Sequence, residues 1–188
     1  MPMKLISSKE ICRTPIFWVT QDCAVDPGGF EIKRAVVQHG GSAVMMPVDA
    51  KGRVLLVRQY RLPARAYLWE LSAGRLDPGE TPLKAAKREL IEETGYRAKI
   101  WTRLCHFYGS PGYVAEKMTI YAAQDLTAGT ATPMEDERIE TKWFTLKDIA
   151  AMIEHGEIVD AKTIIGYTLW RMKGGRSERS HDRKGVVV

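Results

Sequence analysis

Three glutamates, Glu89, Glu92 and Glu93, have residue types and spacing that imply chemistry. They lie in the segment 81–95, which begins with Thr-Pro and ends with glycine, the residues typical of the two ends of a helix. Residues three and four apart share one helix face, so the three carboxylates fall within about 6 Å along the axis. Like charges at this spacing repel each other, and only Arg88 is placed to offset them locally.

A divalent cation would offset this repulsion, and all-oxygen ligands favour a hard ion, Mg²⁺ or Mn²⁺. Such an ion binds through a few carboxylates, keeps waters and takes phosphate oxygens from a substrate, and the glycine-containing loop 74–80 before the helix suits a diphosphate. The ion would neutralise charge on the leaving phosphate and lower the pKa of a bound water. Hydrolysis is therefore the expected reaction. From the helix alone, the alternative is a solvated acidic face without a catalytic task.

The rest of the chain predicts short strands and two more helices that position this loop and helix. Apolar alternation and turn residues indicate strands, and Asp, Thr and Gly mark the ends of the later helices. Strands mixed with a few helices favour an α/β sandwich. The expected strands are 16–20, 30–37, 42–48, 53–59, 68–71, 100–107, 118–123 and 139–144, and the later helices are 145–155 and 160–172.

The glycines and charged residues from Gly74 to Gly95 resemble the Nudix hydrolase signature at every fixed polar and glycine position. Tyr96 departs from it, because the signature prefers an aliphatic residue there, but that position packs rather than reacts. The resemblance implies an α/β/α sandwich with a mixed sheet and a small N-terminal β-rich lobe. It also implies a loop–helix–loop box that binds two or three ions of Mg²⁺ or Mn²⁺ and hydrolyses a nucleoside diphosphate linked to another group.

The same resemblance assigns roles by position. The metal ligands would be Glu89 and Glu93, supported by Glu92 and by the carbonyl oxygen of Ala73. Glu92 and Arg88 would also belong to the catalytic machinery, with Arg88 orienting the carboxylates. The box residues are Gly74, Glu80, Arg88, Glu89, Glu92, Glu93 and Gly95.

Sequence outside the box resembles the ADP-ribose pyrophosphatase branch of the family. The similar segments are 57–61, 69–74 and 160–164, together with Pro111, which lies sixteen residues after Gly95. This resemblance implies Mg²⁺-dependent hydrolysis of ADP-ribose to AMP and ribose 5-phosphate by a metal-activated water. Two alternatives stay open: a hydrolase of another nucleoside diphosphate sugar such as GDP-mannose, and a non-catalytic Nudix domain that senses ADP-ribose.

In that branch the catalytic base comes from an acidic loop before a late strand, and segment 134–140 fills this place. Glu135 and Glu137 are the candidates for the base, and Glu137 also for a further metal ligand. An acidic turn without a task is the alternative.

Four residues outside the box are candidates for substrate binding. Arg34 occupies the position of an arginine that contacts adenine from the partner chain in related dimers. Arg61 suits the diphosphate because guanidinium groups match phosphate oxygens. Glu70 and Glu116 suit ribose hydroxyls. For each, an ordinary surface ion pair is the alternative.

Composition places the chain among ordinary globular proteins. The net charge of +5 arises mostly after residue 170, in a short basic tail that we expect to be a solvated end rather than a nucleic-acid site. No apolar run reaches membrane-spanning or signal-peptide length, and three cysteines favour a reducing compartment, the cytoplasm. The resemblance to the ADP-ribose pyrophosphatase branch implies that 1–40 is a β-rich lobe that builds a homodimer and that 41–172 is the Nudix hydrolase domain, and the basic tail is then 173–188.

Overall fold

The computed structural model describes residues 2–131 and 138–174, which form ten strands and three helices. All three expected helices are found, and every expected strand overlaps an observed one. The strands are β1 (Lys4–Arg13), β2 (Trp18–Val25), β3 (Glu31–Gln38), β4 (Ser42–Pro47), β5 (Val54–Arg61), β6 (Ala66–Glu70), β7 (Ser72–Arg75), β8 (Arg97–Tyr108), β9 (Lys117–Thr127) and β10 (Glu140–Phe144), and the helices are α1 (Pro82–Thr94), α2 (Leu146–Glu154) and α3 (Ala161–Met172). None of these helices is long and apolar enough to cross a membrane.

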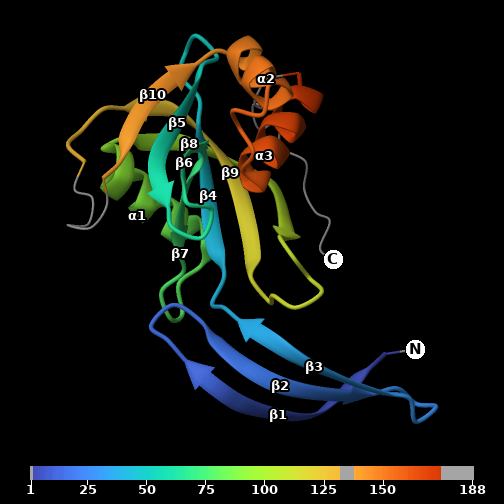
Figure 1. Ribbon diagram of the computed structural model, residues 1–188. Helices are drawn as coiled ribbons and strands as arrows, with labels where there is room; N and C mark the ends of the chain where they lie inside the picture. Colours follow the sequence, from blue (N-terminus) through green and yellow to red (C-terminus); the bar gives the residue numbers. More distant parts are fainter. Residues whose placement is uncertain (1, 132–137, 175–188) are drawn as a thin grey trace, which may run out of the picture.

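The first three strands form an antiparallel sheet of their own, in the order β1-β2-β3, which projects from the rest of the chain (Figure 1). β3 also pairs with the loop after β8, because the Val37 amide donates to the Tyr113 carbonyl (2.8 Å) and the Ala115 amide donates to the Val37 carbonyl (2.9 Å). β2 begins at Trp18, later than expected, because a turn closed by Thr14 takes up the residues before it. These contacts fix β3, which leads directly into β4.

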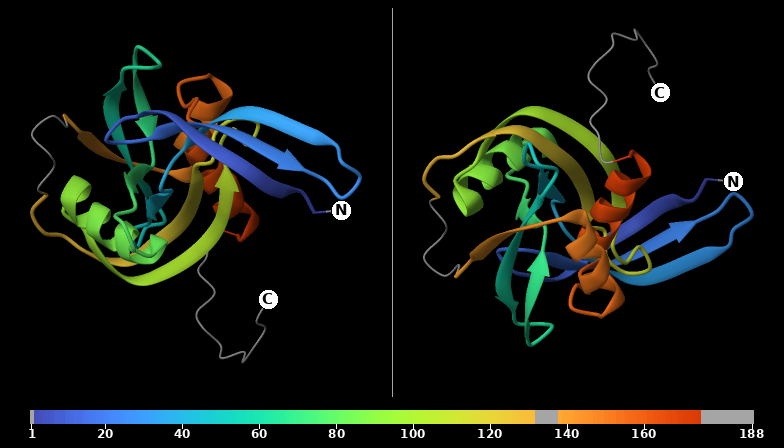
Figure 2. Two further views of the ribbon diagram at one scale, coloured as in Figure 1. Left: turned by 90° about the horizontal axis from the view of Figure 1, so that it is seen from below. Right: turned by 90° about the horizontal axis from the view of Figure 1, so that it is seen from above.

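Two sheets make up the body. One has the order β10-β5-β6, and the other has the order β7-β4-β9-β8, in which β4 and β9 are parallel and the other pairs are antiparallel. Side chains on β4 alternate between the two faces, as the geometry of a strand requires. Ala43 and Met45 pack with α1, whereas Val44 and Met46 pack with the residues of α2 and α3. Figure 2 shows α1 on the opposite side of β4 and β9 from α2 and α3. The expected α/β/α sandwich with a mixed sheet is confirmed.

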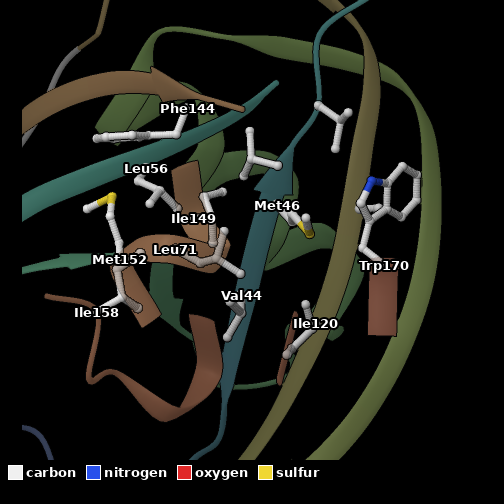
Figure 3. Close-up of a cluster of buried hydrophobic side chains, with 13 residues drawn as sticks. Val44, Met46, Leu56, Leu71, Ile120, Phe144, Ile149, Met152, Ile158 and Trp170 are labelled. Carbon is white, nitrogen blue, oxygen red and sulfur yellow. The ribbon is translucent and has the colours of Figure 1, made fainter. Parts of the chain in front are cut away.

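The larger core lies between the sheets and the helices α2 and α3 (Figure 3). Gly166 lets α3 approach closely, since a Cβ at this position would lie 2.7 Å from Cδ1 of Leu71. Leu71 connects β6 to β7, so this contact fixes the strand that carries the first part of the box. The labelled core residues in Figure 3 are Val44, Met46, Leu56, Leu71, Ile120, Phe144, Ile149, Met152, Ile158 and Trp170.

Helix α1 has the ends that its sequence predicts. The Thr81 side chain accepts a hydrogen bond from the Lys84 amide, and Pro82 is the first helical residue. Gly95 ends the helix with φ of 73°, and a Cβ there would lie 2.7 Å from the carbonyl oxygen of Gly129. Both the left-handed backbone and the close approach require glycine. The caps therefore fix where α1 begins and ends, and with it which residues face β4 and β7.

Candidate active site

The carboxylate of Glu89 on α1 lies directly beside Gly74 on β7. A Cβ added to Gly74 would lie 1.8 Å from the carboxyl carbon of Glu89 and 2.1 Å from its Oε1. The Glu89 carboxylate therefore occupies the space that any side chain at position 74 would fill. This is a physical reason for glycine at the start of the box, and it places the carboxylate beside the backbone of the strand that also carries Ala73.

Glu93 lies one helical turn further along α1 and is only 6% exposed. The hydroxyl of Ser72 donates to its Oε2 at 2.6 Å. A hydrogen bond to an ionised carboxylate is short and comparatively strong, so it fixes the Glu93 side chain against β7. Two carboxylates of α1 are thus held against two positions of the same short strand.

Arg88 connects the loop to the helix through four groups. Its Nη1 donates to Oε1 of Glu89 (2.6 Å) and to Oε2 of Glu92 (3.1 Å), while its Nη2 donates to Oε2 of Glu80 (2.9 Å) and to the Arg75 carbonyl (3.0 Å). The planar guanidinium holds its donors in a fixed fork, so these contacts set the orientation of several carboxylates together. The geometry supports the expected orienting role of Arg88.

Glu80 has a side chain that is only 5% exposed, and its main partner is Arg88. The hydrogen bond from Arg88 is the largest influence on this carboxyl group and holds its pKa below the ordinary value of 4.5, although burial acts in the opposite direction. The same pairing raises the pKa of Arg88 above its ordinary value, so this side chain stays charged at any pH of interest.

We expect Glu80 to make the protein less stable in acid. Because its folded pKa is lowered, the ionised carboxylate adds stability above its ordinary pKa of 4.5, and this contribution is lost as the pH falls towards the folded value. Urea unfolding between pH 6 and pH 3 should therefore show a shallower decline for Glu80→Gln than for the unaltered protein. Glu154→Gln, at an exposed position of α2, is the control and should follow the unaltered protein. Equal slopes for Glu80→Gln and the unaltered protein would contradict this account.

The structure brings two other expected regions together. Arg34 on β3 and Pro111 in the loop after β8 line one cavity of about 350 Å³, together with Val36, Tyr108 and residues 112–115. Arg34 thus shares a cavity with residues of its own chain. A second cavity, of about 390 Å³, is lined by residues that include Arg53, Tyr96 and Trp143, and contains none of the candidate site residues.

Glu116 and Glu70 have partners that the sequence did not reveal. The Ser42 hydroxyl donates to Oε1 of Glu116 at 2.5 Å, and Nδ1 of His39 lies 3.6 Å from the same oxygen. Glu116 is therefore tied to the connection between β3 and β4. Glu70 is only 1% exposed, and its Oε1 accepts from Nε of Arg61 at 2.8 Å. Glu70, the residue expected to bind ribose, is thus buried and is paired with Arg61, the residue expected to bind the diphosphate.

Glu135 and Glu137 lie outside the described residues. The sequence analysis missed two residues that contact candidate site residues: Ser72, which donates to Glu93, and Lys162, which donates to Glu70. A serine in a short, weakly strand-like segment carries no signal of its own, and its contact with Glu93 depends on how α1 packs on β7. Lys162 lies within a segment that resembles the ADP-ribose pyrophosphatase branch, which was the only available signal.

The donor set suits a divalent metal ion. Within residues 2–131 and 138–174, no three His, Cys, Asp or Glu side chains gather into a complete site. Mg²⁺ does not need such a group, because it binds through one or two carboxylates and completes its shell with waters and phosphate oxygens. Glu89 and Glu93 provide carboxylates, and Gly74 leaves the space in which the Glu89 carboxylate lies. These residues therefore fit a hard cation.

Comparisons with known proteins identify the family of the chain. The family model described as "NUDIX domain" matches residues 38–164. The chain is 34% identical to an ADP-ribose pyrophosphatase of Bacillus subtilis over 91% of this chain and 96% of the relative. It is 35% identical to an ADP-ribose pyrophosphatase of Mycobacterium tuberculosis over 86% of this chain and 79% of that relative. A crystal structure described as an ADP compounds hydrolase superposes with a TM-score of 0.78 at 25% identity, covering 93% of this chain and 96% of the other. The chain therefore belongs to the NUDIX domain family.

Proposed function

We propose that this protein is a hydrolase that cleaves the diphosphate of ADP-ribose to AMP and ribose 5-phosphate, and that it uses Mg²⁺. The observation that carries this proposal is the contact of the Glu89 carboxylate with Gly74, beside Glu93 held by Ser72. Nudix hydrolases generally use a divalent metal ion, and the relatives named as ADP-ribose pyrophosphatases are similar over most of this chain. The proposal also includes Mn²⁺ as an alternative to Mg²⁺, and it places two or three ions in each site.

The residues of the box would act in distinct ways. Glu89, Glu93 and the Ala73 carbonyl would hold the metal, with Glu92 in support. A bound divalent ion neutralises negative charge on the phosphates and lowers the pKa of a water molecule. Arg88 keeps Glu89 and Glu92 oriented through its two hydrogen bonds to them.

The general base would come from the segment after residue 131. Glu135 and Glu137 are proposed for this task, and Glu137 also as a further metal ligand. Either carboxylate would take the proton from the attacking water once the diphosphate is in position.

The cavity shared by Arg34 and Pro111 is proposed to receive the nucleoside part of the substrate. Its volume of about 350 Å³ falls within the range of small-molecule sites. Arg61 would bind the diphosphate through its guanidinium group. Glu116, which the Ser42 hydroxyl holds in place, stays a candidate for a ribose hydroxyl.

The N-terminal sheet favours a homodimer. β1 is exposed along its whole length, and a three-stranded sheet that leaves many apolar side chains in water is the kind of surface that a second copy covers. We propose residues 1–40 as a dimerisation lobe, 41–172 as the hydrolase domain and 173–188 as a basic tail, and the cytoplasm as the location. The exposed large apolar residues in this part of the chain are Met3, Leu5, Ile6, Ile11, Ile16, Phe17 and Phe30.

A panel of substrates tests the proposed activity. The protein is incubated with Mg²⁺ and, separately, with ADP-ribose, GDP-mannose, NADH, a diadenosine polyphosphate or dGTP, and the products are separated by chromatography. We expect ADP-ribose to be cleaved to AMP and ribose 5-phosphate with a kcat/KM at least about tenfold above that of GDP-mannose, a difference of about 1.4 kcal/mol. A chelator should abolish turnover. Preference for GDP-mannose or dGTP would contradict the proposed substrate, and tight binding of intact ADP-ribose would indicate a sensing domain instead.

A further inference from the structure

We propose that Lys162 is a positioning residue, which acts through Glu70 to hold the side chain of Arg61 ready for the substrate diphosphate. This inference rests on the proposed function. Lys162 lies in the first turn of α3 with a side chain that is only 7% exposed. A lysine is rarely buried unless it is paired. Its partners therefore indicate what it does.

The carboxylate of Glu70 joins Lys162 to Arg61. Its Oε2 accepts from Nζ of Lys162, and its Oε1 accepts from Nε of Arg61 at 2.8 Å. One cation bound to each oxygen fixes both the position and the plane of the carboxylate. The side chains of Glu70 and Lys162 are only 2% and 7% exposed, so water weakens the pairing between them less than it weakens an ion pair at a surface.

Arg61 uses only Nε in this pairing. Within the part of the chain that the structure describes, its two Nη groups donate no hydrogen bond, Arg61 forms no ion pair with a residue other than Glu70, and the side chain is 40% exposed. A guanidinium that is held through Nε presents its remaining N–H groups outward, and such donors suit two phosphate oxygens. The buried partner thus leaves the phosphate-binding edge of Arg61 available.

The segment from Glu70 to Ser72 connects the partner of Arg61 to the proposed metal-binding box. Glu70 ends β6, and two residues later Ser72 begins β7 and donates to Glu93. The partner of Arg61 and the partner of Glu93 are therefore two residues apart. An Arg61 side chain that is held by Glu70 is therefore suited to bind a diphosphate whose other oxygens face the carboxylates of the box.

The N-terminus of α3 anchors Lys162 and Glu70. Lys162 also donates to Oδ1 of Asp160 at 2.9 Å, and Asp160 caps the helix by accepting from the Thr163 amide at 3.0 Å. The Thr163 hydroxyl in turn accepts from the Leu71 amide at 2.7 Å, next to Glu70 in sequence. Arg61, Glu70, Lys162 and Asp160 together carry no net charge, which keeps the burial of Glu70 and Lys162 tolerable.

Loss of the Lys162 charge would change how Glu70 holds Arg61. Without Lys162, Oε2 of Glu70 has lost its partner, and the carboxylate can rotate and accept hydrogen bonds from Arg61 through both oxygens. Such a bidentate pair is the favoured geometry between a guanidinium and a carboxylate. Arg61 would then present fewer donors to the diphosphate. A purely structural lysine would instead lower stability without changing substrate affinity.

The test is a comparison of steady-state kinetics with ADP-ribose and Mg²⁺. Lys162→Met should raise KM about tenfold, the effect of one weakened charge-assisted contact, and leave kcat within about twofold. Lys147→Met, at an exposed position of α2, is the matched control and should change neither value. Arg61→Gln should itself raise KM, and Lys162→Met combined with Arg61→Gln should raise it no further. Melting temperatures identify loss of stability separately.

An unchanged KM in Lys162→Met, or additive effects of the two substitutions, would overturn the inference. If Lys162→Met does not fold, Glu70→Gln takes its place, because it keeps the shape of the side chain and removes the charge that holds both cations. Failure of the proposed function appears differently, as unaltered protein that leaves ADP-ribose intact. Calorimetric titration with α,β-methylene-ADP-ribose then decides: weaker binding by Lys162→Met supports the inference, and equal or absent binding overturns it.

Discussion

Glu93→Gln is expected to lower kcat for ADP-ribose by about 10²- to 10³-fold, the loss typical of removing one preorganised electrostatic group from an active site. Glu93 is only 6% exposed and is fixed by the Ser72 hydroxyl at 2.6 Å. Glutamine keeps an oxygen that accepts this hydrogen bond but removes the negative charge that would hold the metal. Because a buried charge near Glu89 is itself unfavourable, the variant should melt at or above the temperature of the unaltered protein.

Three measurements test this expectation. Steady-state kinetics at saturating Mg²⁺ give kcat, thermal unfolding followed by circular dichroism gives the melting temperature, and calorimetry gives the affinity for Mg²⁺. Glu154→Gln makes the same chemical change at an exposed position and should leave all three values unchanged. Turnover of Glu93→Gln close to that of the unaltered protein would show that Glu93 is not a metal ligand.

The elements that are fixed by local signals could be predicted from the sequence. α1 begins and ends where Thr81, Pro82 and Gly95 indicate, because capping is decided by residues within one turn of the helix end. β1 was not predicted, since its ten residues are all exposed and two register irregularities interrupt its pairing with β2. β7 was missed as well, because Ser-Ala-Gly-Arg has little intrinsic preference for a strand and pairs with β4 through tertiary context.

In the candidate site, too, local features could be predicted from the sequence and contacts between elements could not. The carboxylates of α1 could be predicted to share one face, because helix geometry alone brings residues three and four apart together. Contacts across elements could not be predicted. Ser72 meets Glu93, and Lys162 meets Glu70, 92 residues away in sequence, only after the sheets and helices have packed. Charge type and spacing therefore identified the proposed metal-binding face, whereas the residues that contact it from other elements could be found only in the three-dimensional structure.

Gly74→Ala tests that packing directly. We expect the affinity for Mg²⁺ to fall by about 10- to 100-fold, the usual cost of disturbing the residues around a metal ligand, and kcat/KM for ADP-ribose to fall with it. A Cβ at position 74 would lie 1.8 Å from the carboxyl carbon of Glu89, so the carboxylate must leave its present place. The displaced group is the end of a flexible side chain, and φ of Gly74 is not positive, so the backbone tolerates alanine and the melting temperature should change by only a few degrees.

Gly40→Ala is the matched control for this substitution. A Cβ at Gly40 would meet only the Leu76 carbonyl oxygen, at an ordinary contact distance of 3.7 Å, so neither metal affinity nor turnover should change. Calorimetric titration with Mg²⁺ separates the two variants without relying on activity. If Gly74→Ala binds Mg²⁺ as tightly as Gly40→Ala does, the position of the Glu89 carboxylate against β7 does not matter for the metal. If Gly74→Ala instead fails to fold, the close contact matters for packing rather than for metal binding. Only weak metal binding by a folded Gly74→Ala protein supports the view that glycine is present at this position to make room for the carboxylate.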